Sequence, residues 1–439
     1  MNGHRLAGYT TAVVMLCSAC SFTGTSSTEA PQSVRAPDRP DCPSWSGHLA
    51  PQLDTVTLHR VRQVVGTVAA HSWNPAAQPS RGKVPGGVFI NWRPGFDGKN
   101  GIAAATNIQG SGSSDAEAGA DPRHDPLADL LILRGTAAYL ATGVTDPAAT
   151  QLACRLGPVV AAEFEHYGVD RGWVYPQLIA LSRLQPSGPW RDQARRFAIL
   201  MSQVYIDPVT GAERDPRRRT YRSDWSAETA AALVLAGVEF DRPDWVTQGR
   251  RAARRLVTHG ANSATGLIPG VLQLRPQVGR DAVIDPLVKV GAQAQLLDSL
   301  LTIHLITGDQ VLLEAVVRAV GSLNDPGIGV IDREHGGYFY AVDADGRNVR
   351  TAYKETRQAW MAPLLLRLAK ATKHDEGGEK MRDLVRDGLF RQDGAGYAYR
   401  VAPDWGEYVW SPEGPRLSEN WISAEATGIA LAVLTGEPS

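Results

Sequence analysis

Acidic and aromatic side chains occur together where several of the expected helices begin. Asp224, Trp225 and Glu228 open one such helix, and Glu355 opens another that is expected near 352–371. Hydrolysis of a glycosidic bond requires two carboxyl groups that flank the bond, one of which donates a proton. The pattern therefore predicts a carbohydrate site in which Asp224, Glu228 and Glu355 are the catalytic candidates.

A second group of residues is expected to contact substrate on the same side of the fold. Their aromatic rings could stack on sugar rings, and their polar groups could bind hydroxyls. Each also has a structural interpretation as a helix cap or an inter-helix hydrogen bond, and this holds equally for Glu228 and Glu425 in two matching Ser-Ala-Glu segments. The predicted substrate contacts are His124, Trp173, Tyr221, Trp225, His335, Tyr353, Arg357 and Trp421.

Twelve helical segments are expected after Cys42 from the spacing of apolar residues and from Gly and Pro breakers. Segment 126–141 is apolar nearly all round, whereas 242–259 is amphipathic. A helix that is apolar on every side must be covered by others, so the alternation predicts an inner and an outer ring. The segments lie near 54–70, 125–143, 146–166, 171–186, 189–205, 224–239, 242–259, 284–306, 308–324, 352–371, 375–390 and 421–435.

The connections between these segments alternate in length. The links from inner to outer helices are a few residues long, as at 307–309, whereas most links back to an inner helix are long, as at 71–124 and 206–223. Short αα-hairpins make neighbouring helices antiparallel, which brings all the long loops to one face. We expect an all-α fold, a single (α/α)6 toroid of six helical hairpins with short β-hairpins in the long loops. A two-domain helical protein is the alternative.

One stretch carries a family resemblance. Residues 334–360 read EHGGYFYAVDADGRNVRTAYKETRQAW, in which Gly336-Gly337, alternating tyrosines and an Asp345-Gly346 turn predict a β-hairpin that leads into an inner helix. The stretch resembles the N-acylglucosamine 2-epimerase superfamily and other six-hairpin, glycosidase-like (α/α)6 proteins. The TGD turn at 307–309 is similar to theirs as well. The resemblance implies this fold and a sugar ligand.

The catalytic histidines of those epimerases have no counterpart in this chain. The superfamily uses two histidines for proton exchange, and the corresponding stretches 285–289 and 419–423 contain none. Proton exchange would then lack a base of near-neutral pKa. We therefore expect a glycoside hydrolase acting on cell-envelope or environmental glycan. A sugar epimerase or isomerase is one alternative, and a non-catalytic glycan-binding lipoprotein is the other.

The N-terminal segment has the pattern of an export signal. Residues 1–20 combine a basic start, the apolar run YTTAVVML and small residues before Cys20, which predicts a signal peptide with a lipobox and lipidation of Cys20. Residues 21–41 are rich in Ser, Thr and Pro and predict a disordered linker, and 42–439 form the barrel domain. The expected location is the extracytoplasmic face of a bacterial cell membrane. Cys42 and Cys154 are expected either to form a disulfide or to remain two buried thiols.

Charge and composition limit the partners. The chain has 439 residues, with 45 Lys and Arg against 46 Asp and Glu, and 43% of its residues are apolar. This near equality of positive and negative charge argues against a nucleic-acid-binding protein. The apolar content is sufficient for a hydrophobic core. We expect a monomer that binds glycan, contacts the membrane only through its lipid anchor and requires neither a metal nor a cofactor.

Overall fold

The computed structural model describes residues 45, 53–92, 123–166, 171–205, 220–275, 279–392, 395–410, 417–418 and 421–436. Its contacts divide the chain into Met1–Asp41 and Cys42–Ser439, and the description below concerns the second unit. The predicted signal, the linker, Cys20 and Cys42 lie outside the described residues. Cys154 is disulfide-bonded to a cysteine outside that part of the chain, so its pairing with Cys42 stays a prediction.

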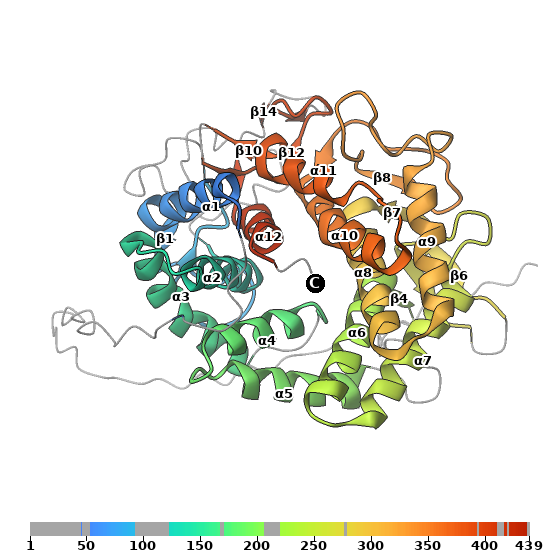
Figure 1. Ribbon diagram of the computed structural model, residues 1–439, viewed down its shortest axis with the longest axis horizontal. Coiled ribbons are helices and arrows are strands. Elements are labelled where there is room, and N and C mark those ends of the chain that lie inside the picture. The colour runs from blue at the N-terminus through green and yellow to red at the C-terminus, as the bar shows by residue number, and fades with distance from the viewer. Residues whose placement is uncertain are drawn as a thin grey trace, which may run out of the picture. The chain divides into compact units, whose positions relative to one another are not determined.

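In the described part of this unit, six helices surround the centre as an inner ring (Figure 1). The inner helices are α2 (Pro126–Ala141), α4 (Val174–Leu184), α6 (Ser223–Glu239), α8 (Val290–Thr307), α10 (Met361–Thr372) and α12 (Ala424–Leu434). Each of the first four contacts the next, and the last contacts the first and η3 (Thr356–Trp360), the 3-10 turn that leads into α10. In α2, α6, α8 and α12, Ala, Leu, Ile and Val are buried on nearly every side, as a covered helix requires, whereas α4 and α10 are buried mainly on one side.

An outer layer of helices covers the inner ring. On α7, Trp245, Ala252 and Leu256 are buried, while Arg251 and Arg254 face solvent. The predicted alternation of inner and outer helices, and with it the (α/α)6 toroid, is confirmed. The outer helices are α1 (Thr55–Thr67), α3 (Pro147–His166), α5 (Trp190–Leu200), α7 (Pro243–Gly260), α9 (Gln310–Asn324) and α11 (Gly378–Asp383). Short π-helical turns extend three of them at Val68–Ser72, Met201–Tyr205 and Leu384–Gly388.

Short antiparallel strands lie in the long loops, at the end of the ring where the inner helices begin. We call this end the loop face. One pair joins distant parts of the chain, because β3 (Asn91–Trp92) pairs with β15 (Ile422–Ser423). The other strands are β1 (Trp73–Asn74), β2 (Gly87–Val88), β4 (Thr220–Arg222), β5 (Val271–Gln273), β6 (Ala282–Asp285), β7 (Leu287–Lys289), β8 (Ala341–Asp343), β9 (Lys354–Glu355), β10 (Phe390–Arg391), β11 (Gly396–Tyr397), β12 (Arg400–Val401), β13 (Val409–Trp410) and β14 (Leu417–Ser418).

Two expected helix starts were wrong. The segment expected as helical from 284 begins with β6 and β7, and α8 starts only at Val290, because Pro286 disfavours a helical backbone at Asp285 and β7 pairs with β8. The segment expected as helical from 352 begins with β9 and η3, so Glu355 lies on a strand. This strand pairs with β12, about 45 residues later, a long-range pairing that local periodicity does not reveal.

The hairpin turn predicted around Asp345-Gly346 is present. The Gly346 N–H donates to the Asp343 carbonyl over 2.9 Å, and Gly346 has a φ of 84°, which a side chain would disfavour. Strand β8 of this hairpin also pairs with β7, which directly precedes α8. The hairpin therefore contacts the segment that leads into α8.

Candidate functional site

Two glutamates at the starts of inner helices each bind an arginine from a neighbouring segment. Arg171 donates through Nε and Nη2 to the two carboxylate oxygens of Glu228, over 3.2 and 3.1 Å. Arg357 Nε donates to Glu425 Oε1 over 2.9 Å. Glu228 and Glu425 are the matching positions of the two Ser-Ala-Glu segments. The sequence repeat thus produces a repeated ion pair at the loop face.

Glu355 lies near the Arg357–Glu425 bridge and is only 7% exposed. Burial raises the pKa of its carboxyl to about 7, although the positive charges of Arg357, Lys289 and Arg400 oppose the shift. Arg400 Nε lies 4.0 Å from Glu355 Oε1. A carboxyl with a pKa near neutrality exchanges protons readily at physiological pH and is suited to general acid catalysis.

Glu425 behaves in the opposite way. Burial acts to raise its pKa, but the Arg357 guanidinium, supported by Arg171 and Arg81, outweighs burial and lowers the pKa below its usual value. Glu425 is therefore ionised while Glu355 can hold a proton. Each carboxyl also feels the charge of Arg357. Neighbouring carboxyls with divergent pKa values are the arrangement that divides the acid role from the base role in glycosidases.

Asp125 is a third carboxyl at the loop face and was not among the predicted catalytic residues. As the N-cap of α2 it accepts the Leu127 N–H on Oδ1 over 2.9 Å, and its Oδ2 lies 3.2 Å from Arg81. Burial raises its pKa. A small cavity of about 40 Å³ lies between Asp125 and Glu425 and has Trp173 and Trp360 in its wall.

Tyrosines form a half-buried wall next to Glu355. The Tyr340 and Tyr353 rings stack with their centroids 4.6 Å apart, and Tyr408 lies 5.0 Å from Tyr353. Arg400 lies over the Tyr353 ring at 4.7 Å, and Lys289 Nζ is 5.5 Å from the Tyr340 centroid. Partly exposed aromatic faces beside cations suit a sugar ring that carries hydroxyl groups. The predicted contact Tyr353 is thus beside Glu355.

The other two predicted catalytic residues are engaged in ion pairs. Asp224 is 3% exposed and binds Arg222, with Oδ2 2.8 Å from Nη2. Glu228 has both oxygens on Arg171. Trp225 lies near both guanidiniums, 5.3 Å from that of Arg171 and 4.9 Å from that of Arg222. This placement favours a positioning role for Asp224, Glu228 and Trp225.

Two predicted substrate contacts lie within the scaffold. His124 is fully buried, with Nδ1 2.7 Å from Asp129 and Nε2 2.8 Å from the Val84 carbonyl. Tyr221 is 5% exposed and donates its hydroxyl to Asp281 over 2.5 Å. Both placements favour a structural role, because neither side chain offers a free polar group to a ligand. Trp421 is half-buried just before β15.

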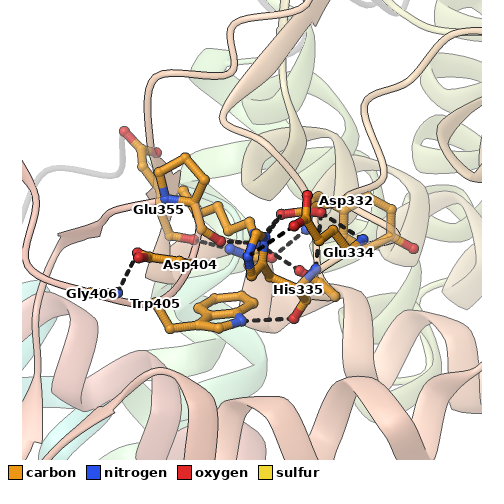
Figure 2. A network of polar contacts seen from close by, with 12 residues as sticks. Asp332, Glu334, His335, Glu355, Asp404, Trp405 and Gly406 are labelled. Atoms are coloured by element: carbon orange, nitrogen blue, oxygen red, sulfur yellow. Dashed lines mark hydrogen bonds and ion pairs between the residues drawn. The ribbon is translucent and has the colours of Figure 1, made fainter.

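His335 belongs to a network that supports the strand of Glu355 (Figure 2). The buried Lys354 ammonium lies 2.7 Å from Asp332 and donates to the carbonyls of Gly336 and Pro403 over 2.8 and 2.5 Å. It also lies 4.0 Å from the Trp405 ring, and Trp405 Nε1 donates to the His335 carbonyl over 2.8 Å. The network therefore joins strand β9, which carries Glu355, to the loops at 332–336 and 403–405.

In the part of the chain that the structure describes, no cluster of three or more His, Cys, Asp or Glu side chains could hold a metal ion. None of the described helices is long and apolar enough to cross a membrane.

Comparison with known proteins shows similarity of structure only. No protein-family model matches the chain, and no curated protein matches it. An unsaturated glucuronyl hydrolase specific for heparin superposes with a TM-score of 0.58 at 13% identity, covering 87% of this chain and 96% of its own. A D-mannose isomerase gives 0.56 at 12% identity, covering 87% and 97%. An inactive variant of the α-1,6-mannanase GH76A of Salegentibacter sp. HEL1_6, in complex with α-1,6-mannotriose, gives 0.54 at 12% identity, covering 86% and 98%.

At these identities the likeness establishes the architecture. The resemblance inferred from residues 334–360 is thereby confirmed at the level of fold, and the chain is a six-hairpin (α/α)6 toroid.

Proposed function

We propose that this protein is a glycoside hydrolase and that Glu355 donates the proton to the leaving group. The observation that carries the proposal is the pair Glu355 and Glu425, whose pKa values are shifted in opposite directions within one charged cluster. Hydrolysis of a glycosidic bond needs one protonated and one ionised carboxyl group. The hydrolases among the structural neighbours support this reaction class, and they leave the sugar open.

The chemistry assigns a separate role to each side chain. Glu355 protonates the glycosidic oxygen, and the ionised Glu425 either activates a water molecule or attacks the anomeric carbon. The tyrosine wall holds the sugar ring, while Arg357 keeps Glu425 charged. Asp125 is a less suitable catalyst because its two oxygens already accept from Leu127 and Arg81.

The experiment is a screen of glycans for release of reducing ends, followed by Glu355→Gln and Glu425→Gln. We expect each variant to lower kcat by about 100-fold to 10,000-fold, and we expect wild-type kcat to fall as the pH rises through about 7, where Glu355 loses its proton. Glu334→Gln is the control, since its side chain is 85% exposed on the nearby loop and should leave kcat unchanged.

Three results would contradict the assignment. Full activity of Glu355→Gln would remove its catalytic role. Deuterium uptake from D₂O into an isomerised sugar, without bond cleavage, would favour a sugar epimerase or isomerase. Glycan binding without any product would favour a non-catalytic binding protein that has kept an enzyme fold.

We also propose that the chain is exported and anchored to the extracytoplasmic face of a bacterial membrane through lipid on Cys20. The apolar run before Cys20 and the polar linker after it support this proposal. Partition of the full chain into the detergent phase should be lost in Cys20→Ala. Equal partition of both proteins would rule out this anchor.

A further inference from the structure

Glu355 and Arg400 face each other on two short strands. The antiparallel pairing of β9 with β12 places Arg400 directly opposite Glu355, and Val401 opposite Lys354. Directly opposite residues of an antiparallel pair point to the same side, whereas consecutive residues point to opposite sides. Lys354 and Val401 are fully buried, while Arg400 is half-buried. The strand pair therefore presents Glu355 and Arg400 together on the side away from the Lys354 network.

An aromatic ring holds the Arg400 guanidinium in place. Tyr353 lies two positions before Glu355, so both side chains point to the same side of the extended chain. The guanidinium lies over the Tyr353 ring, 4.7 Å from its centroid, and 5.8 Å from the centroid of Tyr399. A planar guanidinium stacks on aromatic faces, which the compact ammonium group of lysine cannot do in the same way. Tyr353 thus fixes the position of the Arg400 charge.

The distance from Arg400 to Glu355 differs from that in the neighbouring ion pair. Arg400 Nε lies 4.0 Å from Glu355 Oε1, which is longer than a hydrogen bond. Arg357 Nε, in contrast, donates to Glu425 over 2.9 Å. A direct hydrogen bond from a cation favours the charged form of a carboxyl group. At 4.0 Å the positive charge still acts on the Glu355 carboxyl, but the carboxyl keeps its capacity to hold a proton.

Several titratable groups surround the Glu355 carboxyl, and they come from β7, η3, α12 and the β9–β12 pair. Arg357 and Glu425 balance each other through their hydrogen bond. The two tyrosines remain neutral, because burial raises the pKa of both hydroxyls. Arg400 and Lys289 therefore supply positive charge that opposes the effect of burial. The surrounding groups are Arg357, Lys289, Arg400, Glu425, Tyr353 and Tyr399.

We propose that Arg400 is a positioning residue for the proton donor, held by Tyr353 so that its charge acts on the Glu355 carboxyl without a hydrogen bond between them. The inference rests on the proposed function of Glu355. The charge of Arg400 keeps this carboxyl a stronger acid than burial alone would make it. A stronger acid transfers its proton to the glycosidic oxygen more readily.

The test is a carbon-13 NMR titration of the full chain labelled at the glutamate carboxyl carbons, in which the Glu355 signal is identified by its loss in Glu355→Gln. Arg400→Met should move the midpoint of the Glu355 titration upward from about 7 by about one pH unit, because the ionised carboxylate loses a nearby cation. The alkaline limb of kcat should move in the same direction, and the maximum of kcat should fall severalfold. Arg347→Met is the matched control, since its side chain is 82% exposed on the hairpin turn and should leave midpoint and kcat unchanged.

Arg400→Lys separates the charge from the stacking. Lysine keeps the positive charge, but its ammonium group does not stack on Tyr353 as a planar guanidinium does. We expect a midpoint between those of wild type and Arg400→Met. A lysine variant that equals wild type in both midpoint and kcat would overturn the holding role of Tyr353.

The titration needs no substrate, so it distinguishes failure of this inference from failure of the proposed function. An unchanged midpoint in Arg400→Met would overturn the inference, even where Glu355→Gln abolishes hydrolysis. A shifted midpoint in a protein that cleaves no glycan would support the action of Arg400 on Glu355 and contradict the hydrolase function. If Arg400→Met does not fold, Arg400→Gln removes the same charge, keeps a polar side chain and is titrated in its place.

Discussion

At the scale of single residues, the surroundings of each carboxyl determine its chemistry. Glu334 and Glu355 are the same residue type and lie close in sequence, yet one side chain is 85% exposed and the other is buried with a pKa of about 7. Glu228 shows a third outcome, because Arg171 occupies both of its oxygens. Functional assignment at this scale therefore rests on burial and on neighbouring charge.

The raised pKa of Glu355 has a consequence for stability. Between about pH 4.5 and 7 an unfolded chain releases this proton while the folded chain retains it, so the free energy of unfolding falls as the pH rises through that window. We expect Glu355→Gln to lack this loss and to be more stable than wild type at pH 8, by up to about 3 kcal/mol. Urea unfolding at pH 4 and pH 8 measures the difference.

Glu334→Gln provides the comparison, because an exposed carboxylate should leave the pH dependence unchanged. If the unfolding curves of Glu355→Gln and wild type shift together with pH, then the Glu355 carboxyl is not protonated near neutrality in the folded protein.

At the scale of elements, the loops that carry the site are held by specific contacts. Strand β9 has only two residues, and its position depends on pairing with β12 and on the Lys354 network (Figure 2). Lys354 and Glu355 are consecutive, so their side chains point to opposite sides of the strand. The lysine side joins the loops, and the glutamate side faces the charged cluster.

We expect Lys354→Met to destabilise the fold by about 3–5 kcal/mol, because Asp332 would remain buried without its cation. The double variant Lys354→Met with Asp332→Asn should recover part of this loss. Chemical denaturation of wild type, the single variant and the double variant measures these differences in the free energy of unfolding. Lys380→Met, on the exposed side of α11, should change stability by less than about 0.5 kcal/mol. A Lys354→Met protein as stable as this control would show that the network contributes little.

At the scale of the whole ring, closure depends on the close approach of the first and last inner helices. Helices α2 and α12 lie side by side and contact each other extensively (Figure 1). The pairing of β3 with β15 joins the same two regions of the chain. Glycine permits this approach, since a Cβ on Gly135 would lie 2.7 Å from the Leu431 Cβ. Overpacking at such a contact typically costs about 1–3 kcal/mol.

Gly135→Ala should therefore lower the melting temperature, although alanine is the better helix former. Gly66→Ala is the matched control, because a Cβ at Gly66 in α1 meets no atom within 4 Å and should raise the melting temperature through helix propensity, worth about 1 kcal/mol. Calorimetry compares both variants with wild type. A stabilised Gly135→Ala protein would mean that the two helices separate easily.

The sequence by itself determined the order and character of the helices, and with them the fold. Helices that are apolar all round alternate with amphipathic helices, and short connections alternate with long ones. Both alternations can be read from each stretch of sequence by itself, and an (α/α)6 toroid requires both. The hairpin turn at Asp345-Gly346 was equally local, since only a few residues and a positive φ define it. Glu355, Tyr353 and Arg357 were also recognised from the sequence as a group near one helix start.

Only the tertiary structure decided which carboxyl can act as an acid. The pKa of Glu425 is lowered by Arg357, a residue far away in the sequence. The pKa of Glu355 is raised by burial, which depends on segments that pack around it in the folded protein. The same holds for His124, whose enclosure by Val84 and Asp129 depends on how a long loop folds back over α2. Helical periodicity is encoded within each segment, whereas burial and charge contacts arise only once the ring has closed.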